Sequence, residues 1–190
     1  VHVEYSAGVG CGTTGVGAVK YLGEQFDNGR PGCFEWADNL PRILARFRPQ
    51  VVVVAGGLAN ISDHRIDGRW QHIGELDYDA WLLQQMRDFA AAMSVTGAHV
   101  VWLTNPDVDV PNPPGVGSFP EEDPQRMARY NELIGQLADE LAAVDTADLA
   151  TVVQERPGGQ FDSTFRPDGA HILLTEAPDV VEFIADAIVK

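Results

Sequence analysis

The chain has 190 residues, of which 45% are hydrophobic and 22% charged, and a formal net charge of −15. This length suits one domain with a substantial core, so we expect a single domain over residues 1–190. The acidic surplus argues against a nucleic-acid partner, because phosphate binding needs clustered Lys and Arg. No run reaches the ~18 apolar residues that a membrane span needs. The chain opens on Val1 with no Met or signal peptide, and we expect it to be part of a longer protein.

The two cysteines, Cys11 and Cys33, each lie beside glycine, in loop settings where two thiols can approach. A disulfide that closes a loop of this length would contribute ~3 kcal/mol to stability, and it would indicate an oxidising compartment. The alternative is two unpaired, buried thiols. Two cysteines this far apart lack the spacing of a metal site, so no metal is expected.

In chain order, apolar patterns predict short strands separated by longer helices. The predicted strands cover residues 1–5, 51–55, 99–103 and 149–153, and the predicted helices cover 35–47, 79–94, 123–143 and 176–189. This alternation is typical of repeated βαβ units. We therefore expect an α/β fold, a three-layer α/β/α sandwich around a parallel sheet, with 51–55 as a central strand and 99–103 as its neighbour.

Sites in such sheets lie beyond the carboxyl ends of the strands. A glycine-rich loop, Gly8 to Gly12, follows the first predicted strand. It matches neither nucleotide-binding glycine pattern, and no Lys-Ser or Lys-Thr follows. Its backbone N–H groups are candidate oxyanion donors, and the alternative is a tight turn shaped for packing.

A second candidate segment, Gly56 to Asn60, leaves strand 51–55. Its glycines allow close backbone approach, and Asn60 offers an amide donor to the same edge of the sheet. The alternative is that Asn60 caps the next turn. Nearby, Asp63 and His64 are adjacent in sequence and are interpreted as a surface pair.

Asp168 lies three residues before His171, and Pro167 and Gly169 predict a turn between them. A carboxylate that holds an imidazole in one tautomer is half of a nucleophilic hydrolase site. The alternative is an Asp-capped helix start followed by a core histidine. This segment and the two glycine-containing loops are all expected at one edge of the sheet, which favours the catalytic interpretation. We then expect the Asp168 carboxylate within ~2.6–3.2 Å of a His171 ring nitrogen.

The block from Asp168 to His171, before the last helix, resembles the C-terminal block of the SGNH (GDSL-type) hydrolases, which have a flavodoxin-like fold. The resemblance implies that Asp168 is the acid of a catalytic triad and that His171 is its base. It also implies that Gly10 donates its N–H to an oxyanion. Asn60 matches the family's oxyanion asparagine with a shift of one residue.

The cysteine pair and the loop over 67–70 resemble the extracytoplasmic SGNH domain attached to membrane O-acyltransferases that modify cell-surface glycans. The resemblance implies a Cys11–Cys33 disulfide, an extracytoplasmic location and no cofactor. It implies a serine esterase or O-acyltransferase acting on acyl esters, such as acetyl esters, of carbohydrate. The implied partners are an acylated carbohydrate or small ester and a membrane acyltransferase domain of the parent protein. Trp70 is a candidate sugar platform, although tryptophan is more often part of a core.

The Gly-Asp-Ser block that carries the family's nucleophile is absent. Residues 1–5 resemble the family's second strand, because they run directly into the turn at Gly10, so we expect the nucleophile upstream of Val1. The alternative is Ser6. Two functions remain open: an enzyme, and a non-catalytic domain of the same fold that binds a glycan or a partner. The acyl group, its acceptor, the choice between hydrolysis and transfer, and the oligomeric state do not follow from the sequence.

Overall fold

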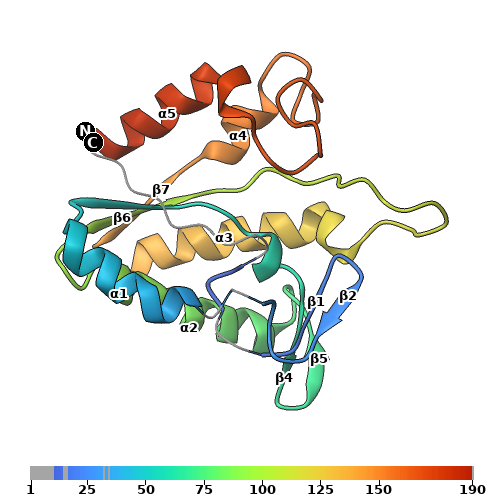
Figure 1. The fold of residues 1–190 in the computed structure, drawn as a ribbon, viewed down its shortest axis with the longest axis horizontal. Coiled ribbons are helices and arrows are strands. Elements are labelled where there is room, and N and C mark those ends of the chain that lie inside the picture. The colour runs from blue at the N-terminus through green and yellow to red at the C-terminus, as the bar shows by residue number, and fades with distance from the viewer. Residues whose placement is uncertain (1–10, 15–16, 32, 34, 190) are drawn as a thin grey trace.

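The computed structural model describes residues 11–14, 17–31, 33 and 35–189 (Figure 1). The predicted strand 1–5, Ser6 and Gly10 lie outside the described residues. The strands are β1 (Val19–Tyr21), β2 (Glu24–Phe26), β3 (Val51–Val54), β4 (Asp63–Ile66), β5 (Arg69–Gln71), β6 (His99–Leu103) and β7 (Val144–Ala147). The α-helices are α1 (Glu35–Phe47), α2 (Leu76–Met93), α3 (Pro124–Glu140), α4 (Leu149–Gln154) and α5 (Pro178–Val189). Short 3₁₀ helices are η1 (Leu58–Asn60), η2 (Pro120–Glu122) and η3 (Leu174–Glu176).

A parallel sheet with strand order β3-β6-β7 runs through the middle of the molecule. The predicted pairing of β3 with β6 is confirmed. Within the described part of the chain, however, β6 is the central strand and β3 lies at an edge, so the expectation of a central 51–55 strand is not met there. Burial agrees with this order, because four of the five residues of β6 are buried, whereas only Val54 is buried in β3.

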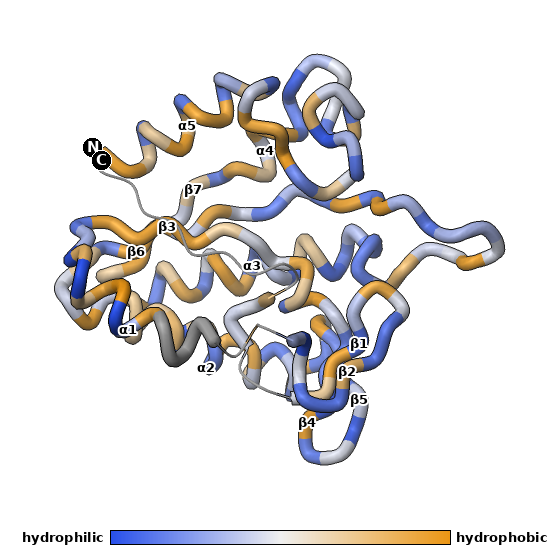
Figure 2. The backbone as a smooth tube through the Cα atoms, in the orientation of Figure 1, coloured by the Kyte–Doolittle hydropathy of each residue, from blue (hydrophilic) through white to orange (hydrophobic). Residues whose placement is uncertain are grey.

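Helices cover both faces of this sheet, which confirms the three-layer α/β/α fold (Figure 1). Because side chains alternate along a strand, β6 supplies both layers. Trp102 packs into a core with residues of α1, α2 and α3, whereas Leu103 packs into a second core with α4 and α5. Figure 2 shows apolar residues concentrated along β3 and β6, between these helical layers.

The predicted strand over 149–153 is wrong, because these residues form α4. The Asp148 side chain accepts a hydrogen bond from the Thr151 backbone N–H, which caps the start of the helix. The strand next to β6 is β7, with Val144 and Ala147 buried. The β-branched pair Val152 and Val153 favours a strand locally, but capping and packing against the second core decide for a helix.

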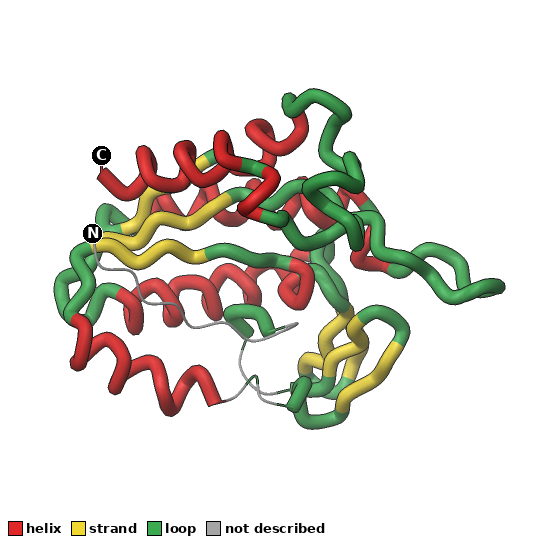
Figure 3. The backbone as a smooth tube through the Cα atoms, turned by 45° about the horizontal axis from the view of Figure 1, so that its top comes forward, coloured by secondary structure: helices red, strands yellow, loops and turns green. Residues whose placement is uncertain are grey.

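A second, antiparallel sheet of order β2-β1-β4-β5 was not predicted. It lies beside the carboxyl-end side of the parallel sheet (Figure 3). Its two hairpins turn at Leu22–Gly23 and Asp67–Gly68, where all four residues have positive φ. Two successive residues with positive φ are typical of the tight type I′ hairpin turn. This sheet fills the region that the sequence analysis left as polar loops.

The predicted disulfide between Cys11 and Cys33 is present, with a Cα–Cα separation of 5.1 Å. It links the segment before β1 to the segment before α1, so the β1–β2 hairpin lies inside the loop that the disulfide closes. Among the described residues, no helix combines the length and apolar character that a membrane crossing requires.

Candidate active site

The turn before α5 brings Asp168 and His171 together as expected. Asp168 Oδ1 accepts the backbone N–H groups of Ala170 and His171, at 3.0 and 2.8 Å. Asp168 Oδ2 lies 2.6 Å from Nδ1 of the His171 ring, within the expected range. One carboxylate therefore fixes both the backbone and the ring of the histidine.

Gly169 makes this turn possible and anchors it to the loop after β6. Its φ is +68°, a conformation that L side chains rarely adopt, and a Cβ there would overlap the carbonyl of Asp109. The Gly169 carbonyl also accepts the Asp109 N–H at 3.1 Å. The backbone of the β6 loop consequently rests directly on the turn that carries the Asp–His pair.

The electrostatics of the pair favour an aspartate that stays ionised. Partial burial disfavours the Asp168 carboxylate, but hydrogen bonds from the His171 ring and from the His171 and Ala170 N–H groups outweigh it and lower its pKa from 3.8 to about 2. A carboxylate only accepts hydrogen bonds, so Nδ1 of His171 carries the proton and Nε2 is the basic nitrogen. The His171 side chain is 77% exposed, so the ring is accessible from solvent.

Asn60 lies buried in η1, and two other elements hold its side chain. Its Nδ2 donates to the Tyr130 hydroxyl of α3 at 2.7 Å, and its Oδ1 accepts the Thr13 N–H at 2.9 Å. The bond to Tyr130 occupies one of the two N–H groups of the amide. The Asn60 side chain therefore joins α3 to the segment that follows Cys11, rather than capping a turn.

The segment after Cys11 lies in tight contact with Asn60. A Cβ on Gly12 would overlap Asn60 Oδ1, so only glycine fits at this position without a shift. Gly10, the predicted oxyanion donor, lies outside the described residues. The structure thus brings the Asn60 loop together with Gly12, the last residue of the glycine-rich loop.

Comparison with known proteins now places the chain in a family. Residues 29–186 match the model of a family described as "Protein of unknown function (DUF459)". The chain belongs to the DUF459 family. The match includes Asn60, Asp168 and His171. The match also includes the block from Asp168 to His171, whose sequence resembles the C-terminal block of the SGNH hydrolases.

No curated protein matches the sequence of this DUF459 chain. Six chains of known structure match it. Among them is a crystal structure of TesA, with 21% sequence identity and a TM-score of 0.48. That match covers 85% of the DUF459 chain and 73% of the TesA chain.

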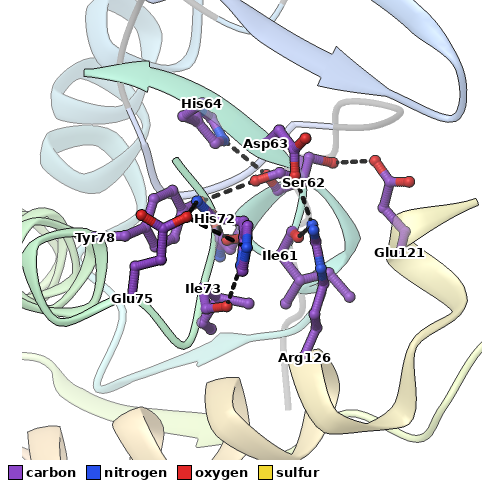
Figure 4. A network of polar contacts seen from close by, with 12 residues as sticks. Ile61, Ser62, Asp63, His64, His72, Ile73, Glu75, Tyr78, Glu121 and Arg126 are labelled. Atoms are coloured by element: carbon purple, nitrogen blue, oxygen red, sulfur yellow. Dashed lines mark hydrogen bonds and ion pairs between the residues drawn. The ribbon is translucent and has the colours of Figure 1, made fainter. Parts of the chain in front are cut away.

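The interpretation of Asp63 and His64 as a surface pair is wrong for this DUF459 protein (Figure 4). Both lie on β4, where successive side chains point to opposite faces. His64 is buried, its Nε2 lies 3.0 Å from the Ala59 carbonyl, and burial lowers its pKa. Asp63 pairs with Arg126 of α3 at 2.8 Å. Neither side chain orients the other.

Sequence reasoning missed a buried carboxylate at Glu121, which belongs to the same polar network (Figure 4). Its Oε1 accepts the Ser62 hydroxyl at 2.6 Å and the Leu22 N–H at 3.2 Å. Glu121 therefore links η2 to the β1–β2 turn and to the residue just before β4. Glu121 lies in an acidic, proline-containing segment, a pattern typical of an exposed loop. The sequence therefore gives little indication that this carboxylate is buried.

Two further expectations concern ligands of the DUF459 domain. Among the described residues, no three His, Cys, Asp or Glu side chains are grouped so that they could hold a metal ion. Trp70, the candidate sugar platform, lies half-buried on β5, and Lys20 Nζ stands 4.4 Å from the centre of its ring. The Lys20 ammonium thus covers one face of the Trp70 ring, on which a sugar would otherwise stack.

Proposed function

We propose that this domain is an SGNH-type serine esterase or O-acyltransferase that acts on acyl esters, such as acetyl esters, of cell-surface carbohydrate. The observation that carries the proposal is the 2.6 Å contact of Asp168 with Nδ1 of His171 on an accessible turn. An aspartate on Nδ1 leaves Nε2 to take a proton from a serine hydroxyl. The loops after β3 and β6 lie at the same end of the sheet as this turn (Figure 1).

In the proposed reaction, a serine hydroxyl attacks the ester carbonyl while His171 Nε2 takes its proton. Asp168 stabilises the imidazolium that forms. Backbone N–H groups near Gly10 and the amide of Asn60 hold the negative charge on the carbonyl oxygen. The tetrahedral intermediate then collapses to an acyl-serine, and His171 returns the proton to the leaving alcohol. Water or a sugar hydroxyl attacks the acyl-serine in the second half-reaction, which gives an acid or a new ester.

The nucleophile in this proposal comes from the N-terminal side, either from sequence before Val1 or from Ser6. Two contacts support that direction. The bond from the Thr13 N–H to Asn60 holds the segment after Cys11 beside the Asn60 loop, and the disulfide ties Cys11 to Cys33. The disulfide also supports an extracytoplasmic location, because such bonds persist in oxidising compartments. A membrane acyltransferase partner remains part of the proposal.

The test compares the 190-residue chain with a chain that carries the native upstream sequence. Each is assayed with 4-nitrophenyl acetate and labelled with a fluorophosphonate probe, and the labelled serine is located by peptide mass spectrometry. We expect turnover and labelling in the extended chain, loss of turnover in His171→Ala, and full turnover in His99→Ala. His99 is a matched control because it also contacts an aspartate.

Two other outcomes have a clear meaning. Turnover by the 190-residue chain that disappears in Ser6→Ala would make Ser6 the nucleophile. No turnover and no labelling in either chain would contradict the enzyme and would favour the non-catalytic domain. Binding of acetylated and deacetylated glycans to the unlabelled protein would then be measured.

A further inference from the structure

Arg166 is a buried cation two residues before Asp168. It is only 1% exposed and ranks among the largest fully buried side chains. Burial lowers its pKa, while the charges of Asp168 and Asp107 act in the opposite direction. Arginines are rarely buried to this degree, because removing a guanidinium from water is costly unless its donors are satisfied. The partners of Arg166 should therefore show what it does.

The Arg166 guanidinium donates to main-chain carbonyls. Its Nε and one terminal nitrogen both donate to the Ala170 carbonyl, at 3.3 and 3.1 Å. The other terminal nitrogen donates to the Gln160 carbonyl at 2.8 Å. The rigid fork of an arginine suits two such fixed acceptors. The charge is thus used to hold two points of the backbone in place.

The first of these points is the peptide group between Ala170 and His171. Arg166 binds its carbonyl, and Asp168 Oδ1 accepts its N–H, which belongs to His171. One peptide unit is therefore held from both ends. Since this peptide carries the Cα atom of His171, its position sets where the ring meets Asp168 Oδ2.

The second point, Gln160, connects the turn to the loop after β6. The Gln160 side chain accepts the Asp107 N–H at 3.2 Å and donates to the Asp107 carboxylate at 3.1 Å. Asp109 of the same loop bonds to Gly169. Arg166 thereby fixes the turn and one attachment of the neighbouring loop relative to each other.

We infer that Arg166 is a positioning residue. It sets the orientation of His171 toward Asp168, and it sets the position of the loop over residues 104–119 relative to the turn that carries this pair. This inference deepens the proposed function, and its catalytic meaning rests on that function. The orientation itself can be measured without any activity.

The test uses Arg166→Met and Arg166→Lys, with Arg156→Met as matched control. Arg156 is a neighbouring, largely buried arginine that pairs with Asp179 and donates to the Glu176 carbonyl. It stacks on the Phe165 ring, whereas Arg166 donates to the Ala170 carbonyl. The readout is the NMR signal of the proton on His171 Nδ1, assigned by its loss in His171→Ala. A short bond to a carboxylate shifts such a proton downfield and slows its exchange with water.

We expect this signal to be lost in Arg166→Met and retained in Arg156→Met. Arg166→Lys should keep it with faster exchange, because an ammonium can still bind the Ala170 carbonyl but lacks the fork. Should the proposed esterase activity be present, Arg166→Met lowers kcat on the order of 100-fold with KM nearly unchanged. The lysine variant recovers part of this loss.

An unchanged Nδ1 proton signal in a folded Arg166→Met protein would overturn the inference. If Arg166→Met fails to fold by circular dichroism, Arg166→Lys decides, and a signal and exchange rate identical to the wild type would overturn it as well. A lost signal in a protein without any esterase activity would support the positioning role and contradict the proposed function alone.

Discussion

Two Asp–His pairs of nearly equal length occupy opposite ends of the parallel sheet. His171 Nδ1 lies 2.6 Å from Asp168, and His99 Nε2 lies 2.7 Å from Asp145. His99 opens β6 and pairs across to β7, so its pair lies at the amino end of the strands. The pair of His171 lies at the carboxyl end, where sites in such sheets are found.

The two pairs differ in which ring nitrogen faces the carboxylate. Asp145 faces Nε2 of His99, whereas Asp168 faces Nδ1 of His171 and also accepts two backbone N–H groups from the same turn. The Asp145 side chain is 73% exposed on its strand. A short Asp–His distance alone therefore does not indicate catalysis; the contact of Asp168 with Nδ1 of His171 does so together with its setting. The two pairs differ in the ring nitrogen that faces the carboxylate, in the backbone N–H groups that bind the carboxylate, and in the end of the sheet at which the pair lies.

The largest expected contrast follows from replacing each aspartate. Asp168→Asn should lower kcat of the proposed esterase by roughly 10⁴-fold, because the amide no longer stabilises the imidazolium or enforces the tautomer. Asp145→Asn should leave kcat unchanged. Steady-state kinetics with an aryl acetate measure both, and equal losses in the two variants would remove the distinction between the pairs.

A smaller contrast separates two glycines with similar backbone angles. Gly169 and Gly159 have φ values of +68° and +76°, but only at Gly169 would a Cβ overlap a neighbour, the Asp109 carbonyl. Each substitution by alanine should cost about 1–2 kcal/mol of unfolding free energy for the left-handed conformation. Gly169→Ala should also displace the turn and lower kcat on the order of 100-fold. Activity retained in Gly169→Ala would show that the turn tolerates a shift.

Acid should weaken the contribution of Asp168 to the stability of the fold. The pKa of Asp168 is lowered from 3.8 to about 2, so its ionised form stabilises the fold above about pH 4, and this contribution is lost as the pH falls toward 2. The difference in Tm between wild type and Asp168→Asn should therefore shrink between pH 4 and pH 2. Since Asp168 is half-exposed, solvent screening keeps the effect small. A constant difference across this range would contradict the assignment.

The smallest expected effect is the coupling between His99 and Asp145. Exposed ion pairs contribute about 0.2–1 kcal/mol in double-mutant cycles. A cycle of His99→Ala and Asp145→Ala, followed by urea unfolding, should give a value in this range that decreases in high salt. A coupling of several kcal/mol would indicate a buried, structural pair.

The sequence predicted features that depend on local pattern. Continuous apolar runs indicated β3 and β6, and helical spacing indicated α1 within the observed bounds. The Asp-x-x-His spacing indicated the contact of Asp168 with His171, because a four-residue turn with a glycine has few other ways to close. The Cys11–Cys33 disulfide, predicted from the glycine beside each cysteine and from the family resemblance, is confirmed.

Features that depend on distant partners were missed. His64 faces inward because β4 joins a sheet whose partner strands begin at Val19 and Arg69. The Asp67-Gly68 pair is a hairpin signal that the sequence contains, but the strands on either side of it are only three or four residues long. Glu121 and Arg166 look like surface charges, and only their long-range contacts show that they are buried.

The Cys11–Cys33 bond has a consequence for how the chain behaves when it is cut. The bond makes residues 11–33 a covalent ring, with the exposed turn at Gly23 and Glu24 on its outside. A protease that cleaves this turn would break one peptide bond, yet the two fragments would stay joined through sulfur. The nicked protein would run as one band on a non-reducing gel and separate only with a reductant. Cleavage of this turn would therefore not by itself detach the N-terminal piece from the rest of the chain, which carries His171.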